Sequence, residues 1–345
     1  QHRNRLEGML QQLTNHVDRR ELRNAEQHEH NLLWETIPDI FKMSHFPRLD
    51  RNIPEYTRGS HRRGVGAYNF ERPLRTNQGR VFLARDAEAA PVVVKVLSKP
   101  EIHSPCEIEE INCECCFLRE FKHPNIAKCT EVLHTAKRFY IILEHAGTEN
   151  LEQYCRSKPQ SRLDAGEAID AFKQVVDALG WMHQRQISHR SVSLNHVVIR
   201  QEASIHCTLV DFRLAVRAPG ETLSRKVCGF LPCIAPEVGL GGAYIPRLAD
   251  SWSAGILLLE MAGGLKSLSK SANYHEDAQS LDAMRAVINF FQAPHCHAKA
   301  LGKIGGEHYL QVLDLLEKLL VLTSRSRMSM PDLSQRIVHP DRTSK

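Results

Sequence analysis

The spacing of apolar positions changes along the chain and divides it into three parts. In residues 1–44 apolar side chains recur every three or four positions, in two stripes: Leu6, Met9, Leu10, Leu13 and Val17, then Leu32, Leu33, Ile37 and Phe41. This period is typical of amphipathic helices, so we predict a helical N-terminal extension over these residues. Its apolar face must dock, either on the rest of the chain or on a partner protein.

Residues 45–69 lack such a period and contain residues that interrupt helices and strands: Pro47, Pro54, Gly59, Gly64 and Gly66. We predict a linker here. A basic run lies in the same segment, at Arg58, His61, Arg62 and Arg63. This run leaves a second interpretation open, a docking or phosphate-contacting patch.

From residue 70 the pattern first indicates strands and then helices. The runs GRVFLAR, PVVVKVL and RFYIILEH are rich in β-branched and aromatic residues, and one helical stretch follows Pro105. Helical patterns dominate after residue 150, and the almost wholly apolar run WSAGILLLEMAGG predicts a buried central helix. The fold class is therefore α+β, with a small β-rich lobe over about residues 70–146 and a larger helical lobe over about residues 147–340.

Composition and charge narrow the function classes. The 345 residues carry a net charge of +5 with basic residues spread along the chain, which argues against nucleic acid as the main partner. No apolar run approaches the roughly 18 residues of a transmembrane helix. Ten cysteines in a chain of this length indicate reduced thiols, so we expect a cytoplasmic protein, with a nuclear one as the alternative. Gln1 in place of Met indicates a fragment or a processed form.

Six short motifs follow one another in an order that points to a family resemblance. They are Lys95 in VVVK, Glu114 nine residues before HPNI, LVDFRLA around Asp211, CGFLPCIAPE ending at Glu237, DSWSAG beginning at Asp250, and Arg327. In this order and at this spacing they resemble the motifs of a eukaryotic protein kinase domain of the serine/threonine type, over about residues 70–340. The resemblance implies a two-lobed, protein kinase-like fold.

The same resemblance implies a nucleotide site between the lobes. Lys95 would contact phosphates, Glu114 would hold this lysine, and Asp211 would bind the metal ion. The adenine ring would lie between valines, with a leucine behind it and two hinge residues beside it: Val81, Val93, Val198, Leu143, Glu144 and Ala146. The apolar positions either line an adenine-sized cavity or fill it, and both interpretations stay open.

Other positions match residues that hold such a domain together. His189 and Phe212 would stack with two further side chains and link the lobes, namely Leu118 and Cys129. Asp250 would anchor the catalytic loop. Glu237 and Arg327 lie far apart in the sequence, and the resemblance implies that they form a buried ion pair.

The loop ISHRSVSLNHVVIR departs at three positions from the family pattern His-Arg-Asp-x-Lys-x-x-Asn. Ser191 replaces the aspartate that accepts the substrate proton, and a serine is not ionised near neutral pH. Ser193 removes the positive charge of the lysine. His196 replaces the asparagine, whose oxygen suits Mg²⁺ better than an imidazole nitrogen does.

Two further departures concern the phosphate side of the implied site. Arg213 replaces a glycine two residues after Asp211 and places a positive charge beside the metal-binding carboxylate. A guanidinium paired with Asp211 would take the place of Mg²⁺. The glycine-rich loop keeps only Gly79, with Leu74 and Thr76 at the other glycine positions.

No intact set of catalytic groups remains, so our main interpretation is a pseudokinase that acts as a scaffolding, binding or allosteric-regulatory module. Its partners would be proteins, bound through residues 1–44 or through the activation segment, which we define as residues 211–237. ATP would bind weakly, if at all, with little dependence on Mg²⁺. One alternative is a divergent, active serine/threonine protein kinase that transfers phosphate from ATP to protein hydroxyls. Another is a kinase-like fold with a different transfer chemistry.

Overall fold

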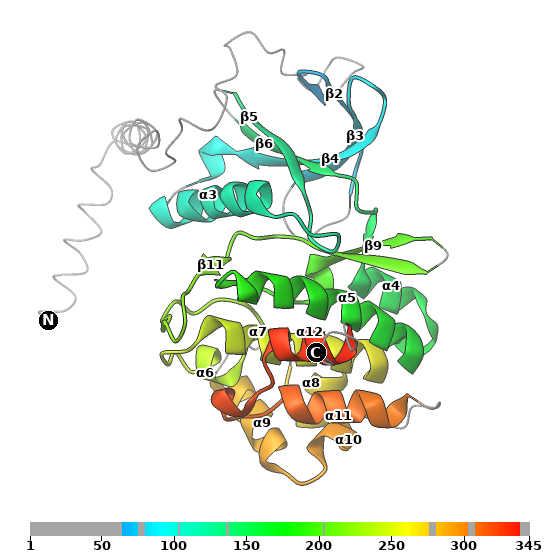
Figure 1. Ribbon diagram of the computed structural model, residues 1–345, viewed down its shortest axis with the longest axis vertical. Coiled ribbons are helices and arrows are strands. Elements are labelled where there is room, and N and C mark those ends of the chain that lie inside the picture. The colour runs from blue at the N-terminus through cyan, green and yellow to red at the C-terminus, as the bar shows by residue number, and fades with distance from the viewer. Residues whose placement is uncertain are drawn as a thin grey trace, which may run out of the picture.

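The computed structural model describes seven stretches of the chain: residues 64–74, 80–102, 104–135, 138–202, 204–275, 281–302 and 308–338. The predicted N-terminal extension, the basic run and the glycine-loop positions Thr76 and Gly79 lie outside these described residues. The two-lobed α+β architecture is confirmed, with a small sheet-rich lobe above a larger helical one (Figure 1).

Within the described residues the small lobe holds a six-stranded antiparallel sheet in the order β1-β2-β3-β4-β6-β5. Its strands are β1 (Gly64–Val65), β2 (Tyr68–Pro73), β3 (Arg80–Arg85), β4 (Pro91–Ser98), β5 (Cys129–His134) and β6 (Arg138–Glu144). A short 3-10 turn, η2 (Lys99–Glu101), leads to helix α3 (Pro105–Glu120), which lies beside the sheet (Figure 1). Ser104 begins this helix with a capping box, since its hydroxyl accepts from the Glu107 N–H and the Glu107 carboxylate accepts from the Ser104 N–H.

The sheet begins at Gly64, six residues before the lobe boundary that we predicted at residue 70. Gly64 and Gly66 belong to the β1–β2 hairpin and not to a linker. A Cβ at Gly64 would collide with the carbonyl oxygen of Tyr68, and Gly66 has a φ of 54°. Both positions of the hairpin therefore require glycine. The sequence pattern alone does not distinguish such hairpin glycines from the glycines of a linker.

The larger lobe contains the helices α4 (Leu151–Ser157), α5 (Ala165–Gln184), α6 (Pro236–Gly239), α7 (Pro246–Gly263), α8 (Ser267–Ala272), α9 (Leu281–Gln292), α10 (Cys296–Leu301), α11 (Tyr309–Leu319) and α12 (Met330–Ile337). Short strands line its upper side: β7 (Glu149–Asn150), β8 (Ile187–Ser188), β9 (Val197–Gln201), β10 (Ile205–Leu209) and β11 (Val216–Arg217). Its described part also contains the 3-10 turns η3 (Pro159–Ser161), η4 (Leu194–His196) and η5 (Ser324–Ser326).

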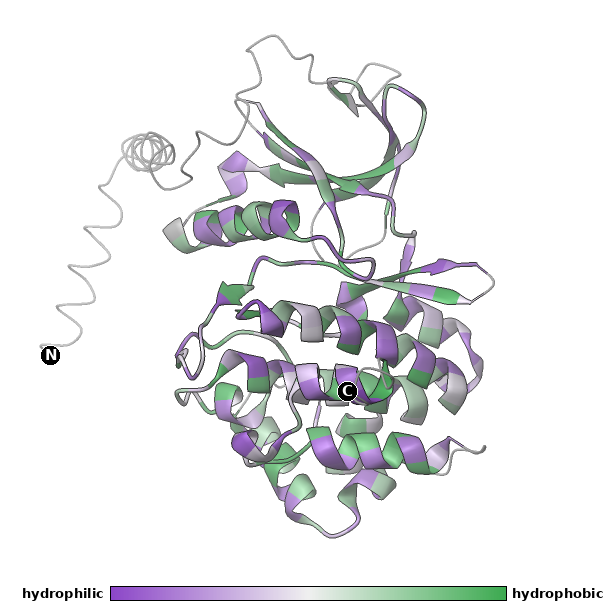
Figure 2. Ribbon diagram, viewed as in Figure 1, coloured by the Kyte–Doolittle hydropathy of each residue, from purple (hydrophilic) through white to green (hydrophobic). Residues whose placement is uncertain are grey.

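Among the described residues, two apolar clusters form the core. A small one on the outer face of the sheet contains Val92, Val94 and Val96 of β4. The larger one runs from α3 and β5 through α5 and into α7, where every residue from Leu248 to Ala262 is buried. Figure 2 shows mostly hydrophobic residues along the strands of the sheet. The prediction that the apolar run around Trp252 is a buried central helix is confirmed.

None of the helices in the described part of the chain combines the length and the apolar character that crossing a bilayer requires. The apolar helix α7 owes its composition to its place in the middle of the larger lobe.

Candidate functional site

A cleft of about 840 Å³ opens between the lobes. Each of the positions predicted for the nucleotide side lines it: Lys95, Glu114, Val81, Val93, Leu143, Glu144, Ala146, Val198 and Asp211. Val93 and Lys95 point to the same side of β4, because side chains alternate along a strand. The apolar side chains therefore line a cavity and do not fill it.

Sequence analysis missed part of the lining. Ala127 and Val210 extend the apolar wall, and three amides stand at the opposite side: Asn150, Gln153 and Asn195. Asn150 caps α4, donates to the Asn195 side chain at 3.1 Å and is bonded to Gln153. The sequence offers a helix-capping signal at Asn150 but none that places it beside Asn195.

Lys95 and Glu114 meet at the inner end of the cleft. Lys95 Nζ lies 2.7 Å from both carboxylate oxygens of Glu114 and 3.6 Å from Asp211 Oδ1. All three side chains are buried. Burial raises the pKa of Glu114, and the positive charge of Lys95 opposes this rise. The prediction that Lys95 and Glu114 face each other is confirmed by this contact.

Arg213 holds Asp211 in a two-point ion pair. Its Nε donates to Oδ1 at 2.8 Å and its Nη2 to Oδ2 at 3.1 Å, the parallel arrangement that suits a guanidinium and a carboxylate. Burial acts to raise the pKa of Asp211, but Lys95 and the hydrogen bonds from Arg213 outweigh it and hold that pKa well below its usual value. Asp211 is therefore an anion whose charge the chain itself balances.

Ser191 and His196 lie against each other in the catalytic loop. His196 Nδ1 is 2.5 Å from the Ser191 carbonyl oxygen and 3.1 Å from its hydroxyl, while Nε2 is 3.5 Å from Asp211 Oδ2. Burial lowers the pKa of His196, although Asp211 acts to raise it. Because Nδ1 donates to the carbonyl, it carries a proton and cannot accept one from the serine hydroxyl. Nδ1 of His196 therefore cannot act as a general base for the Ser191 hydroxyl.

Ser193, at the position of the family's lysine, is buried, and its hydroxyl has no hydrogen-bond partner among the described residues. It offers no charge to a phosphoryl group.

The donor set at Asp211 does not fit Mg²⁺. This ion prefers six oxygen ligands in octahedral geometry. Both oxygens of Asp211 are engaged by Arg213, and the neighbouring side chain His196 presents nitrogen. Among the described residues no group of three or more His, Cys, Asp or Glu side chains could hold a metal ion.

Asp250, a fully buried residue of α7, holds the backbone of the catalytic loop through hydrogen bonds. Its carboxylate accepts hydrogen bonds from the N–H groups of His189 at 2.8 Å and Arg190 at 2.7 Å, and lies 2.9 Å from His183 Nε2. The Arg190 side chain donates to the Leu214 carbonyl at 2.6 Å. None of these contacts involves a replaced residue, so the replacements leave these anchors of the loop in place.

His189 and Phe212 are in edge contact, with ring centroids 4.9 Å apart, and Leu118 and Cys129 are buried. Phe121, which sequence analysis missed, touches Phe212 at 5.0 Å and joins α3 to the larger lobe. The sequence does carry a signal for Phe121. It follows Phe117 by four residues, and side chains at this spacing lie on the same face of a helix.

The ion pair between Glu237 and Arg327 is present. The two guanidinium nitrogens lie 2.6 Å and 2.7 Å from the two carboxylate oxygens, and the arginine side chain has no exposed surface. The pair joins the end of the activation segment to the segment that follows η5.

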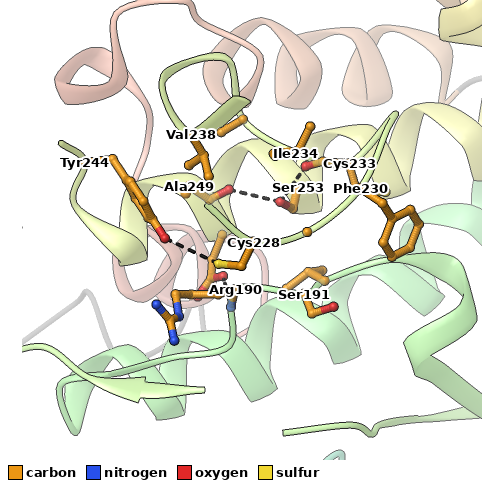
Figure 3. A pocket seen from close by; sticks show the side chains of 14 residues that line it. Arg190, Ser191, Cys228, Phe230, Cys233, Ile234, Val238, Tyr244, Ala249 and Ser253 are labelled. Carbon is orange, nitrogen blue, oxygen red and sulfur yellow. Dashed lines mark hydrogen bonds between the residues drawn. The ribbon is translucent and has the colours of Figure 1, made fainter. Parts of the chain in front are cut away.

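A smaller cavity of about 330 Å³ lies behind the catalytic loop (Figure 3). Arg190 and Ser191 face it from the loop, while Cys228 and Phe230 face it from the activation segment (Figure 3). Ser253 of α7 donates to the Cys233 carbonyl at 2.7 Å and ties the segment down. This cavity belongs to the packing of the loop on α7.

Comparisons with known proteins find one matching family and several similar proteins. The family described as "Protein kinase domain" matches residues 75–338. CBL-interacting protein kinase 31 of Oryza sativa subsp. japonica is 30% identical over 224 residues, 63% of this chain and 46% of that protein. CBL-interacting protein kinase 4 of the same plant is 32% identical over 208 residues, 58% of this chain and 45% of that protein. The chain thus spans somewhat less than half the length of these curated relatives.

Proposed function

Because the chain belongs to the protein kinase domain family, matched over residues 75–338, we propose that it is a member without phosphotransfer activity, a pseudokinase. It acts through binding, as a scaffolding or allosteric-regulatory module. A protein kinase domain in general takes ATP and Mg²⁺ and transfers phosphate to a hydroxyl. In this chain the apolar positions of the ring site are present, and Lys95, Glu114 and Asp211 are retained on the phosphate side, but the other groups that handle the phosphoryl transfer are replaced: Ser191, Ser193, His196 and Arg213.

The observation that carries the proposal is the two-point ion pair between Arg213 and Asp211. A metal ion would have to displace the partly exposed Arg213 guanidinium from the buried Asp211 carboxylate before it could bind. The second support is Ser191, since neither its hydroxyl nor the protonated Nδ1 of His196 accepts a substrate proton. Removal of a general base commonly costs roughly 10²- to 10⁴-fold in rate.

The second candidate is a divergent but active serine/threonine protein kinase. The comparisons favour it, because the named relatives are themselves protein kinases. The contact between Lys95 and Glu114 also favours it, since active members need this pair. The two candidates differ in one measurable respect, the transfer of phosphate.

A single-turnover assay separates the two candidates. We expect no transfer from radiolabelled ATP to a generic serine/threonine protein substrate, nor to the chain itself. The variant S191D alone stays inactive, because Arg213 still holds Asp211. The combined variant S191D/S193K/H196N/R213G gains transfer that depends on Mg²⁺. Transfer by the unaltered chain that is lost in K95M and D211N would overturn the proposal and establish the active kinase.

The proposed partners are proteins, and the proposed binding sites are residues 1–44 and the activation segment. All ten cysteines lie in the described residues without a disulfide, which supports the proposed cytoplasmic location. The triple variant L6S/L10S/L13S tests the N-terminal site in the full chain. Loss of a binding partner at an unchanged melting temperature supports the interaction role, and a large drop in melting temperature assigns these leucines to the fold.

A further inference from the structure

The inner end of the cleft carries no surplus positive charge in the described residues. Lys95 lies against Glu114 and Asp211, and Arg213 lies against Asp211. Two cations therefore face two anions at short range. Arg213 itself stands outside the lining. Among the described residues, the lining has two further charged side chains, Glu144 and Glu149, and Glu144 is paired with Lys128. A triphosphate placed here would bring about four negative charges to a site whose described cations, Lys95 and Arg213, are already paired.

The outer part of the cleft suits an uncharged ring. Val81 and Val93 cover it from the small lobe, Val198 lies on the opposite side, and Leu143 and Val210 are further apolar members of the lining. Planar heteroaromatic rings bind well between such aliphatic walls. Among the described residues the Ala146 backbone makes no hydrogen bond, so its N–H and C=O are open to ring heteroatoms.

The entrance offers acceptors and amides suited to hydroxyl groups. Glu149 accepts a hydrogen bond from Gln201 at 2.8 Å through one carboxylate oxygen, and this orients the group at the edge of the cleft. Asn150 and Asn195 are bonded to each other at 3.1 Å beside it. A carboxylate next to fixed amides can accept hydrogen bonds from the hydroxyls of a sugar and requires no charge on it.

We propose that this cleft binds an uncharged purine nucleoside in preference to a nucleoside triphosphate with Mg²⁺. The inference rests on the proposed function, because a site that discriminates against the phosphoryl donor serves binding and not transfer. The ring lies between the valines and the sugar lies at Glu149, while Asp211, at the inner end where phosphates would extend, is already paired with Arg213. The volume of about 840 Å³ lies within the range of small-molecule sites.

The test is calorimetric titration of the full chain with adenosine, guanosine, ADP and ATP, each with Mg²⁺ and with EDTA. We expect a purine nucleoside to bind at least about tenfold more tightly than ATP, a difference of about 1.4 kcal/mol. We also expect ADP to lie between them, and EDTA to leave all dissociation constants within about twofold.

Two variants locate the effect. In R213G the carboxylate of Asp211 loses its guanidinium partner, so ATP with Mg²⁺ binds at least about tenfold more tightly while adenosine changes less than about twofold. In V93F the larger side chain blocks the ring site and abolishes nucleoside binding. A matched control, V96F, enlarges a buried residue of the same strand that belongs to the outer cluster of the sheet, and folded V96F protein retains nucleoside binding.

The outcomes separate this inference from the proposed function. Tight binding of ATP with Mg²⁺ without transfer, or no binding of any purine, overturns the nucleoside preference and leaves the pseudokinase proposal intact. Tight binding of ATP with Mg²⁺ together with transfer overturns both. The predicted order, with its reversal in R213G, supports the inference.

Discussion

At the scale of single residues, His189 shows how a buried polar group is satisfied in one protonation state. Its Nδ1 accepts from the Ser191 N–H at 3.2 Å, and its Nε2 donates to the Val210 carbonyl at 3.1 Å. Both ring nitrogens are thus satisfied only in the neutral imidazole. Burial lowers the pKa of His189 to about 4, although Asp250 acts to raise it.

This histidine should make the fold sensitive to acid. Below about pH 6.5 His189 binds a proton in the unfolded chain but stays neutral in the folded one. The free energy of unfolding therefore falls as the pH drops from 6.5 towards 4. The contribution lost across this window is about 3 kcal/mol, from about 1.4 kcal/mol for each unit of the depression. We expect urea unfolding at pH 7, 6, 5 and 4 to show this loss in the unaltered chain but not in H189Q.

The control for this series is H206Q. His206 lies partly exposed on β10, where its Nε2 is 3.2 Å from the Pro124 carbonyl, so this variant makes the same replacement outside the core. Parallel profiles for H189Q and the unaltered chain would show that the buried imidazole does not set the acid limit.

Residue-scale prediction from the sequence worked where family motifs name the position. The motifs predict that Lys95, Glu114 and Asp211 lie together. In the structure Lys95 Nζ is 2.7 Å from Glu114 Oε1 and 3.6 Å from Asp211 Oδ1. The geometry of Arg213 was only a hypothesis, because neighbours in the chain can point either way and rotamers are decided by packing. Phe121 and the amides of the cleft were missed because no local period reports a contact between distant segments.

At the scale of elements, Arg327 joins three parts of the larger lobe. Besides Glu237 it donates to the Leu248 carbonyl at 3.0 Å and the Val321 carbonyl at 2.7 Å. Its guanidinium also lies 5.0 Å from the centre of the Trp252 ring. Removal of one partner leaves the other buried and unpaired.

We therefore expect R327A to lower the free energy of unfolding by about 3–5 kcal/mol. Arg285 provides the matched control, because its pair with Asp282 is more than two-thirds exposed on both sides. R285A should cost less than about 1 kcal/mol in the same urea titration. Equal losses of unfolding free energy in R327A and R285A would mean that burial of the Arg327–Glu237 pair does not increase its contribution to stability.

The activation segment and α3 are joined by two surface ion pairs. Arg217 binds both oxygens of Glu120 at 2.8 Å and 2.9 Å, and Lys226 binds Glu110 at 3.0 Å. Since these side chains are partly exposed, we expect R217A/K226A to change the free energy of unfolding by less than about 1 kcal/mol. Amide exchange over residues 219–230 should nevertheless become faster, because the segment loses these contacts with the small lobe.

Hydrogen–deuterium exchange followed by mass spectrometry measures this local effect. K173A, which removes an exposed pair with Asp170 on α5, is the matched control and should leave the segment unchanged. If exchange in the segment is equally slow in the double variant, the anchors at Leu214 and Cys233 hold it without help from α3.

At the scale of the whole molecule, the larger core is continuous between the lobes, and Phe121 lies where they meet. Its ring touches Phe117 at 5.6 Å, Trp181 at 5.7 Å and Phe212 at 5.0 Å. The partly exposed Phe70, which stacks on Phe82 at 4.9 Å, belongs to the small cluster on the outer face of the sheet. The two phenylalanines therefore test different parts of the core.

We expect F121A to cost about 3–5 kcal/mol and to speed amide exchange in both lobes, because the cavity opens between them. F70A should cost less than half as much and affect only the sheet. Thermal unfolding followed by exchange measurements checks both statements. A purely local effect of F121A would show that the lobes are energetically separate despite their common core.

The division into lobes could be predicted from the sequence because it depends on period alone. Alternating and helical patterns change near Ala146, and the structure changes from sheet to helices close to that residue. The start of the sheet could not be predicted, since the glycines of the β1–β2 hairpin have the composition of a linker. Apolar periodicity also cannot show what residues 1–44 dock on.

The Arg213–Asp211 pair bears on which cellular ligand would occupy the cleft. A site that takes ATP with Mg²⁺ is occupied for as long as the cell supplies that complex. If the cleft prefers an uncharged nucleoside, as proposed above, its occupancy is not tied to that supply. It would instead follow the concentration of free nucleosides, which rises when ATP is broken down, so this fold would report a shortage of ATP.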